Sequence, residues 1–356
     1  MSPFIHNSFA QRVVFGAGSL ASLAAELQRL GINRPFVLTT PDASAMGEAV
    51  SAALAGQVSG KFDGAVMHVP SAIADAAQSA AAAAGADAYL AIGGGSTIGL
   101  AKALAVRGDL PIAVIPTTFS GSEMTSIWST TGNAQKTTGR DIRALPRLVV
   151  YDPHLVRTLP RDVATTSGIN AIAHCVESMY AVDGNPITSL LAEEGIRALA
   201  ESLPRLAEVS PDEAAFSGAL YGSWLAGSAL NAVSMAIHHK LCHTLGGMFN
   251  LAHAPTHTVM LPYSVAYNEA AAPQAMLRIR RALGQFDTGS AAGGLRQLQQ
   301  VLGAPTALSS LGMPRAGIAE AVEAALQQPY PNPRPLDRRS LLQLLEQAFD
   351  GRPPAL

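Results

Sequence analysis

Five histidines fall within one short segment, residues 237–257, which reads IHHKLCHTLGGMFNLAHAPTH. His239 and His243 are four residues apart, so on a helix they share one face. Asn170 and His174 repeat this spacing in the stretch NAIAH. Histidine is the side chain best suited to metal ligation and to proton transfer near neutral pH. Two helices that each present a polar pair predict a small, polar, buried site, in preference to isolated core histidines.

A run of glycines predicts a second site, for an anionic group. The sequence GGGS at residues 93–96 follows a short apolar run and opens a helical pattern that includes Lys102. Glycines let backbone N–H groups approach an anion closely, and the start of a helix adds unpaired donors. By itself this run could equally be a tight strand-to-helix turn.

A second polar loop favours a nucleotide at this place. Residues 116–123, PTTFSGSE, follow another apolar run and offer hydroxyls and a glycine. Nucleotides bind at the carboxyl edge of the strands in open α/β sheets. The two loops together predict a dinucleotide site, although the common GxGxxG pattern is absent. The residues expected to contact the cofactor here are Gly93, Gly94, Gly95, Ser96, Thr117, Thr118, Ser120 and Ser122.

The bulk composition excludes several classes of protein. A chain of 356 residues exceeds what one core usually supports, so two domains are expected. A formal charge of −2 without any basic run argues against nucleic acid as a partner. We expect no membrane partner either, since no apolar stretch could span a bilayer and no secretory signal is visible. Cys175 and Cys242 are the only cysteines, which excludes a disulfide scaffold and favours the cytoplasm.

The elements that must position these residues follow from the apolar patterns. Short β-rich runs alternate with helical patterns in the first part of the chain, which predicts a mainly parallel sheet with helices on both faces. Strands are expected at residues 36–39, 66–69, 89–92, 112–115 and 148–151, and helices at residues 43–54 and 72–84.

After about Pro160 the spacing of apolar residues becomes helical, which predicts an all-α domain. Residues 329–335, PYPNPRP, read as an extended connector, and Asp337 is expected to cap a last helix through Ala348. The expected domains are therefore residues 1–160, an NAD(P)-binding α/β domain, and residues 161–356, a helical catalytic domain.

Several separated motifs occur together in a fixed order: GGGSTIGLAKA, IPTTFSGSEMT, YDPHLVRTLP, GINAIAHCVES and HKLCHTLGGMFNLAH. This combination resembles the iron-containing alcohol dehydrogenase superfamily along nearly the whole chain, and its details are similar to the maleylacetate reductases within it. The resemblance implies an N-terminal Rossmann-like domain, a C-terminal helical domain, and a cleft for NAD(P) and, usually, a divalent metal. It also implies a homodimer.

The resemblance assigns roles to individual residues. The metal-ligand positions of the family fall on Asn170, His174, His239 and His253. His243 matches a further active-site histidine that is often given a role in proton transfer. His238 and His257 are left open, either as site residues or as ordinary polar residues.

Two departures from the family pattern change the expected charge of the site. Asn170 stands where metal-dependent members carry Asp, and Lys240 stands where they carry a small residue. The first removes the anionic ligand, and the second repels a cation and attracts a carboxylate. We therefore expect a site for an anionic substrate that does not require a metal.

A third departure concerns the cofactor. Thr39 and Thr40 stand where many members place the Asp that holds the adenosine ribose, so both NADH and NADPH are expected to bind. Gly99 also replaces an Asp that is usual six residues after the first glycine of GGGS.

The resemblance implies NAD(P)H-dependent reduction of the conjugated double bond of maleylacetate, a small dicarboxylate, to 3-oxoadipate in the catabolism of aromatic compounds. The expected catalytic residues are His243, as proton donor, with His253 and His174. His239, Lys240 and Asn170 are expected to bind the substrate.

The sequence leaves other functions open beside this one. The main rival is a metal-dependent alcohol or polyol dehydrogenase on the same fold. A lyase similar to dehydroquinate synthase would use NAD only transiently. A non-redox zinc hydrolase would leave both nucleotide loops unexplained, and a non-catalytic binding protein has no need of a histidine-rich site.

Overall fold

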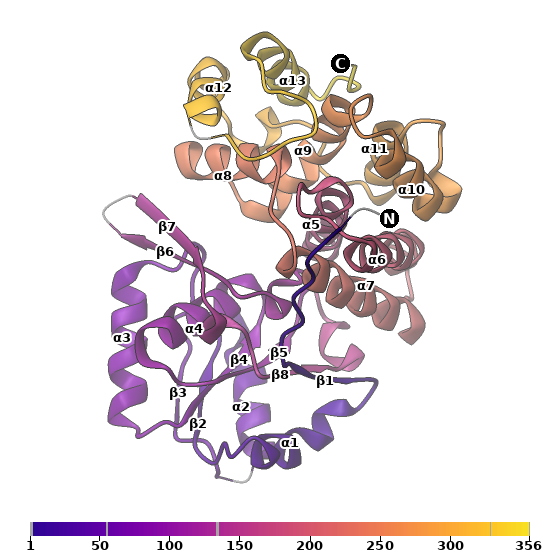
Figure 1. Cartoon of the computed structure of the whole chain (residues 1–356). Helices are drawn as coiled ribbons and strands as arrows, with labels where there is room; N and C mark the ends of the chain where they lie inside the picture. The colour runs from indigo at the N-terminus through magenta and orange to yellow at the C-terminus, as the bar shows by residue number, and fades with distance from the viewer. Residues whose placement is uncertain (1–2, 55, 133–134, 328, 356) are drawn as a thin grey trace. The chain divides into compact units, whose positions relative to one another are not determined.

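The computed structural model describes residues 3–54, 56–132, 135–327 and 329–355. The chain divides into two compact units. One spans Phe9–Leu159, and the other spans Pro160–Leu356 together with the N-terminal segment up to Ser8. The first is a Rossmann-like α/β unit and the second is all-helical, as the sequence predicted (Figure 1).

The α/β unit is built on a six-stranded parallel sheet with the order β1-β8-β5-β4-β2-β3. The strands are β1 (Arg12–Phe15), β2 (Pro35–Leu38), β3 (Gly60–Phe62), β4 (Ala88–Gly93), β5 (Ile112–Pro116) and β8 (Leu148–Tyr151). The strand order reverses between β2 and β4, because β3 continues to one side of β2 while β5 continues beyond β4. Ligands of open α/β sheets bind outside the carboxyl ends of the strands at such a reversal.

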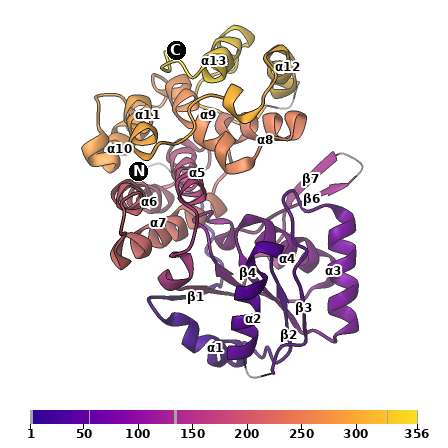
Figure 2. The same ribbon diagram turned by 180° about the vertical axis from the view of Figure 1, so that it is seen from behind.

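Helices cover both faces of the sheet (Figures 1 and 2). Leu90 and Ile92 of β4 pack on the side of α1 (Leu23–Arg29) and α2 (Ser44–Ala53). Tyr89 and Ala91 pack on the side of α3 (Ser71–Ala83) and α4 (Gly95–Gly108). Successive side chains of a strand point to opposite faces, so a strand buried on both faces is apolar throughout, which explains the continuous apolar runs of the sequence.

One expected strand is wrong. Residues 66–69 do not form a strand, since His68 and Val69 have positive φ angles of 66° and 45°, which an extended chain cannot adopt. Val69 instead packs against α4, where a Cβ atom on Gly99 would lie 3.1 Å from its Cγ2. The strand of this region is β3, which lies earlier and is too short to show an alternating pattern.

An antiparallel hairpin formed by β6 (Ile127–Gly132) and β7 (Gln135–Arg140) completes the strands of the α/β unit. Its first strand begins shortly after the second polar loop, and the hairpin lies beside α3 and α4 (Figure 2). None of the described helices is long and apolar enough to cross a membrane.

The helical unit contains no strand within the described residues. Its α-helices are α5 (Arg161–Tyr180), α6 (Pro186–Leu206), α7 (Glu213–Asn231), α8 (Ile237–Phe249), α9 (His253–Asn268), α10 (Pro273–Leu283), α11 (Ala291–Leu302), α12 (Ile318–Gln327) and α13 (Arg338–Asp350). The predicted cap of α13 is confirmed, because the Asp337 side chain accepts a hydrogen bond of 2.8 Å from the Ser340 N–H. Leu241 of α8, Tyr263 of α9 and Leu344 of α13 share one apolar core.

Candidate active site

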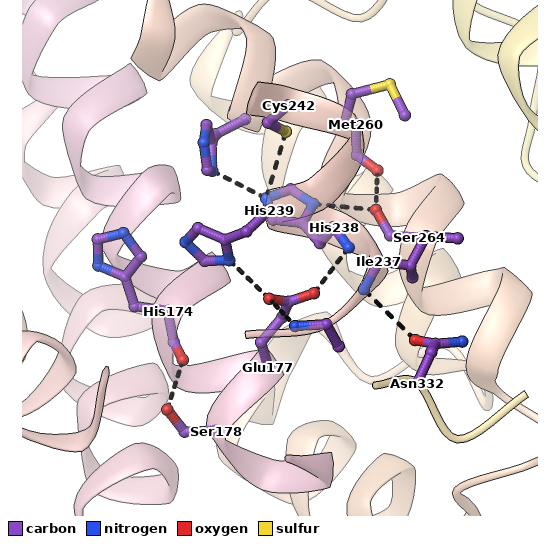
Figure 3. Close-up of polar contacts among 12 residues, drawn as sticks. His174, Glu177, Ser178, Ile237, His238, His239, Cys242, Met260, Ser264 and Asn332 are labelled. Carbon is purple, nitrogen blue, oxygen red and sulfur yellow. Dashed lines mark hydrogen bonds and ion pairs between the residues drawn. The ribbon is translucent and has the colours of Figure 1, made fainter. Parts of the chain in front are cut away.

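Three polar residues lie on one face of α5. Asn170, His174 and Glu177 follow each other at four and three residues, which places them above one another on successive turns, and all three are buried. Glu177 Oε1 accepts from the His238 backbone N–H at 2.7 Å, and Oε2 accepts from the Ala236 N–H at 2.9 Å (Figure 3). The carboxylate therefore caps the start of α8, where backbone donors are unpaired and negative charge is stabilising.

Glu177 also orients a histidine. Its Oε2 lies 2.6 Å from His239 Nδ1 (Figure 3). With that nitrogen donating to the carboxylate, the ring is fixed and Nε2 is presented to the site. Sequence reasoning missed Glu177, although its spacing from Asn170 and His174 marks it as part of the same face of α5.

The structure brings the histidines of α5, α8 and α9 together. The ring of His174 stacks on His239 with centroids 5.2 Å apart, and His239 lies 4.9 Å from His257. His253 lies 4.2 Å from His257 and 6.2 Å from His243. All of the expected site histidines are therefore in one cluster, and the two left open by the sequence, His238 and His257, belong to it as well.

Several buried polar atoms of this cluster have no hydrogen-bond partner among the described residues. They are Asn170 Oδ1, His174 Nδ1, His239 Nε2 and His257 Nε2. Buried polar groups of native proteins are nearly always paired, so a concentration of such atoms marks a place that receives a polar ligand.

Burial sets the charge of the most enclosed rings. Desolvation lowers the pKa of His174, His238 and His257 well below the ordinary value, and the neighbouring imidazoles lower each pKa further. These three rings are therefore neutral at about pH 7. His243 is half-buried and His253 is exposed, so these two are the histidines of the cluster that water reaches.

The donor set differs from that of a tightly held dication. The positions assigned to a metal are Asn170, His174, His239 and His253, which offer neutral nitrogen and amide-oxygen atoms. Among the described residues, the ligand atoms that lie within 4.8 Å of one another belong to a different set, His238, Cys242 and His257. The family's histidine positions do not form such a group, and without an anionic ligand the set as described is a weak one for a dication.

Lys240 contacts a ring outside the histidine cluster. Its Nζ lies 5.7 Å from the centre of the Tyr330 ring, which belongs to the proline-rich connector before α13. Burial lowers the pKa of Lys240. Lys240 directly follows His239, and adjacent residues of a helix face different sides, so the two side chains leave α8 in different directions. Among the described residues, the ring that the Lys240 ammonium contacts is that of Tyr330.

The two cysteines are buried and unpaired, as expected. Cys175 lies beside His174 in the sequence but faces α6, where a Cβ atom on Gly195 would lie 2.7 Å from its sulfur. Desolvation raises the pKa of both thiols, so neither is a reactive thiolate near neutral pH.

In the α/β unit, the two polar loops lie side by side. Gly93 at the end of β4 pairs with Pro116 at the end of β5, and the Thr117 N–H donates to the Gly93 carbonyl at 3.0 Å. A Cβ atom on Gly94 would lie 2.6 Å from the Thr118 methyl group, so glycine is required there for the loops to approach. Nothing lies within 4 Å of a Cβ on Gly95, the first residue of α4.

These observations fit a phosphate group. The first turn of α4 has no side-chain cap, so its backbone N–H groups are available to an anion beside the open surface at Gly95. The remaining expected cofactor residues, Ser96, Thr117, Thr118, Ser120 and Ser122, are half-buried at the ends of β4 and β5.

Thr39 lies at the strand reversal, directly after β2. Its side chain is buried and packs against α2. A Cβ atom placed on Gly47 of α2 would lie only 2.8 Å from the Thr39 Cγ2 atom. Thr40 is half-buried and follows it. The next carboxylate along this segment is that of Asp42, which is exposed.

A buried lysine holds the second loop. Lys102 Nζ donates to the carbonyl oxygens of Ser122 at 2.5 Å, Thr125 at 2.7 Å and Ile127 at 3.1 Å. Burial lowers the pKa of Lys102 to about 7. Glu123 in the same loop is buried as well, and desolvation raises its pKa while Tyr151 donates to it at 2.7 Å. The sequence marked Lys102 only as part of a helix.

Comparison with known proteins agrees with the motifs. The profile of iron-containing alcohol dehydrogenases matches residues 10–153, and that of the C-terminal part of the family matches residues 164–349. The chain is 52% identical to the maleylacetate reductase of Sphingobium indicum over 99% of both chains, and 52% identical to that of Burkholderia cepacia over 100% of both. The maleylacetate reductase structures from Agrobacterium tumefaciens and Rhizobium sp. share 44% and 45% identity, cover 99% of this chain and 100% of theirs, and superpose with TM-scores of 0.95 and 0.94. The chain therefore belongs to the iron-containing alcohol dehydrogenase family.

Proposed function

We propose that this protein reduces the conjugated carbon–carbon double bond of maleylacetate, using NADH or NADPH, and forms 3-oxoadipate. The observation that carries the proposal is the identity of about half of all residues to maleylacetate reductases over the whole chain. The neutral donor set around Asn170 supports it against a metal-dependent alcohol dehydrogenase, whose chemistry needs a firmly held cation.

The α/β unit has the features of a cofactor-binding domain. We assign residues 1–160 to NAD(P) binding and residues 161–356 to the helical catalytic domain. The free N–H groups at the start of α4, together with the close approach of Gly94 to Thr118, support a pyrophosphate at the ends of β4 and β5. Thr39 and Thr40 would meet the adenosine ribose beside the strand reversal.

The reaction explains why the site is rich in imidazoles. When bound, the reduced nicotinamide supplies a hydride to the alkene carbon β to the ketone. The charge that then develops on the ketone oxygen must be stabilised, and the neighbouring carbon must receive a proton. We assign the proton donation to His243, because it is half-buried in the cluster and water can return its proton.

The other residues of the cluster would bind the substrate and its developing charge. His174, whose ring stacks on His239, and His253, whose ring lies 4.2 Å from that of His257, complete the proposed catalytic set. His239, oriented by Glu177, and Asn170 would contact the substrate. Lys240 would attract a carboxylate, in competition with its contact to Tyr330.

We propose further that catalysis does not require a divalent metal. Asn170 supplies no negative charge, and the family's histidine positions do not gather their ligand atoms. The family as a whole is iron-containing, so this property would set the chain apart. We also propose a cytoplasmic homodimer, which light scattering of the purified protein would test.

The decisive experiment follows the absorbance of NADH or NADPH with freshly generated maleylacetate as substrate. Stoichiometric oxidation of the cofactor, with 3-oxoadipate as product, is the expected result. A simple alcohol or polyol oxidised faster than maleylacetate is reduced would overturn the proposal. Cofactor that is bound but not consumed would point to a lyase.

A further inference from the structure

A buried lysine connects the two loops that are expected to hold the cofactor. Lys102 lies on α4, seven residues after Gly95, so the two residues share one face of that helix. Gly95 begins the helix beside the expected phosphate group, and Lys102 contacts the end of the second polar loop two turns further along. One helix therefore carries the first loop at its start and holds the second loop by a side chain.

The ammonium group of Lys102 is fully used by this loop and the residues that follow it. Its Nζ lies 2.8 Å from the Thr125 Oγ1 atom, in addition to the carbonyl oxygens of Ser122, Thr125 and Ile127. An ammonium group has three protons and no lone pair, so these oxygens leave no donor for a ligand. The Lys102 side chain is also buried. Any effect of Lys102 on a ligand must therefore pass through the loop.

The second polar loop is held at both ends. At its start, the Thr117 N–H donates to the Gly93 carbonyl at 3.0 Å. At its end, the backbone carbonyl oxygens accept from Lys102. The span between these anchors contains Thr118 and Ser120, which are expected to contact the cofactor. The position of this span therefore depends on both anchors.

Two hydroxyl groups lack partners where the loops approach each other. Thr97 Oγ1 and Thr118 Oγ1 are buried and have no hydrogen-bond partner among the described residues. A Cβ atom on Gly93 would lie 2.5 Å from the first, and a Cβ atom on Gly94 would lie 2.9 Å from the second. Buried hydroxyl groups of native proteins are nearly always paired, so these two favour a polar ligand at this place. The spacing of the loops then decides how well that ligand is held.

We propose that Lys102 is a positioning residue for the nicotinamide cofactor, because it holds the second polar loop at the distance from Gly94 that lets Thr118 and Ser120 meet a phosphate group. A loop that is already ordered loses less conformational freedom on binding, so the ligand is bound more tightly. This inference rests on the proposed function for its ligand, NADH or NADPH. In this role Lys102 acts on the cofactor through the loop alone.

The neighbouring carboxyl group of Glu123, which is also buried, offers Lys102 an alternative role as a counter-charge. Glu123 Oε1 accepts from the Tyr151 hydroxyl at 2.7 Å, and its backbone carbonyl accepts from Gln11 Nε2 at 2.9 Å. Glu123 Oε2 has no hydrogen-bond partner among the described residues, so Lys102 does not pair with it. The contacts of Lys102 therefore favour positioning of the loop over balance of charge.

The test measures the binding of NADPH to the full chain by fluorescence, without substrate. Lys102→Met keeps an unbranched side chain of similar length and removes every donor. This variant should bind NADPH at least about tenfold more weakly, because the loop is then ordered only on binding. With maleylacetate, the KM for NADPH should rise, while kcat and the KM for maleylacetate stay within about twofold of the unmodified values. Equal affinity of both proteins for NADPH would overturn the inference.

Two control variants separate positioning from charge and from stability. Lys102→Gln is neutral like Lys102→Met but retains two N–H donors, so it should bind NADPH more tightly than Lys102→Met. Leu27→Ala removes a buried side chain from α1, on the other face of the sheet, and should lower stability without changing the affinity. Equal affinities of the two Lys102 variants, or a matching loss in Leu27→Ala, would overturn the inference. Recovery of affinity when Glu123→Gln is added to Lys102→Met would also overturn it in favour of charge balance.

Hydrogen exchange of the unmodified protein tests the anchoring without any variant. In the free protein, the N–H groups of residues 122–127 should exchange slowly, and those of residues 118–121 should become slower when NADPH binds. Fast exchange of residues 122–127 in the free protein would overturn the inference. A protein that binds NADPH but does not reduce maleylacetate would reject the proposed function and leave this inference standing. A protein that binds neither NADH nor NADPH would overturn both.

Discussion

The histidines of this site divide by their access to water. His174, His238 and His257 are buried with depressed pKa values, so they act as neutral hydrogen-bonding groups. His243 is half-buried, and its ring lies 5.9 Å from His239. A proton donor must regain its proton in each turnover, and this favours a residue in contact with solvent.

Replacing His243 with Ala should therefore lower kcat by about 10²–10⁴-fold, the usual scale of general acid catalysis. The affinity for NADPH should change little, since the expected cofactor residues lie in the α/β unit. Steady-state kinetics and cofactor fluorescence measure the two effects. A kcat close to that of the unmodified protein would remove His243 from the mechanism and leave His253 as the candidate donor.

Lys240 differs from the histidines because its contact is with Tyr330. If it attracts a substrate carboxylate, the interaction exists in the ground state and the transition state alike, and Lys240→Met should raise KM while kcat stays nearly constant. Tyr330→Leu removes the ring contact and keeps the charge, so it should leave KM closer to normal. An unchanged KM in Lys240→Met would show that another cation anchors the substrate.

At the scale of elements, two buried ionisable residues, Glu177 and Lys102, position the segments in which the sequence motifs lie. Glu177 of α5 caps α8 and orients His239. Lys102 of α4 draws together the carbonyl oxygens of the loop that follows β5. Each satisfies several backbone groups that a loop or a helix end would otherwise leave unpaired.

Lys102 gives the stability of the chain a defined dependence on pH. Its pKa is about 7 in the folded protein and close to 10.5 when the chain is unfolded, so between these values the unfolded state holds the extra proton. Stability from this group therefore rises with pH, by up to about 1.4 kcal/mol per pH unit. The difference in unfolding free energy between the unmodified protein and Lys102→Met should grow from about pH 7 to pH 10.

Urea unfolding at several pH values measures that difference, and Lys61→Met, at an exposed lysine paired with Glu48, serves as the control. The control should show no such trend, because a surface ion pair contributes little. A constant difference for Lys102→Met would mean that this lysine keeps its proton in the folded state.

On the proposed function, the residues that follow β2 are expected to decide the choice between NADH and NADPH. Thr39 is buried under α2 and Thr40 is half-buried, and neither can repel a 2′-phosphate. NADPH should therefore be used alongside NADH, with kcat/KM values that differ by less than about a thousandfold, or ~4 kcal/mol. Thr40→Asp should shift the preference toward NADH, because an acidic residue there binds the ribose and repels the phosphate. A stronger preference for NADH in the unmodified protein would implicate Asp42.

The elements that carry a long periodic pattern could be predicted from sequence, and those that depend on tertiary contacts could not. The i, i+4 pairs placed Asn170, His174, His239 and His243 correctly on helices. The strand predicted at residues 66–69 was wrong because these apolar residues form a turn, in which Val69 packs against Gly99. The partners of His238, Ser264 and His257, lie 26 and 19 residues away along the chain, and no local pattern reveals them.

At the scale of the whole molecule, the chain keeps the family's architecture, and the resemblance of its motifs implies that Asn170 changes the charge of the site. The α/β unit retains the strand reversal and the open start of α4 on which nucleotide binding depends. The helical unit retains the histidine positions but pairs its buried carboxylate, Glu177, with His239 and with the start of α8. No carboxylate stands at the position of Asn170. On the proposal of a metal-independent reaction, this one position would separate the fold of the family from dependence on metal.

Activity of the whole enzyme without metal is the consequence that tests this view. Exhaustive chelation, checked by elemental analysis, should leave maleylacetate reduction essentially unchanged, because neutral imidazoles and an amide hold a dication weakly. Three histidines can bind zinc, so some metal in untreated preparations is compatible with this expectation. Asn170→Asp should restore an anionic ligand and increase the affinity for a divalent cation about tenfold or more, measured by calorimetry with Zn²⁺. Asn170→Ser, which adds no charge, is the matched control and should not bind more tightly. Complete loss of activity on chelation, restored by a single metal, would show that the site depends on that metal in spite of its neutral donors.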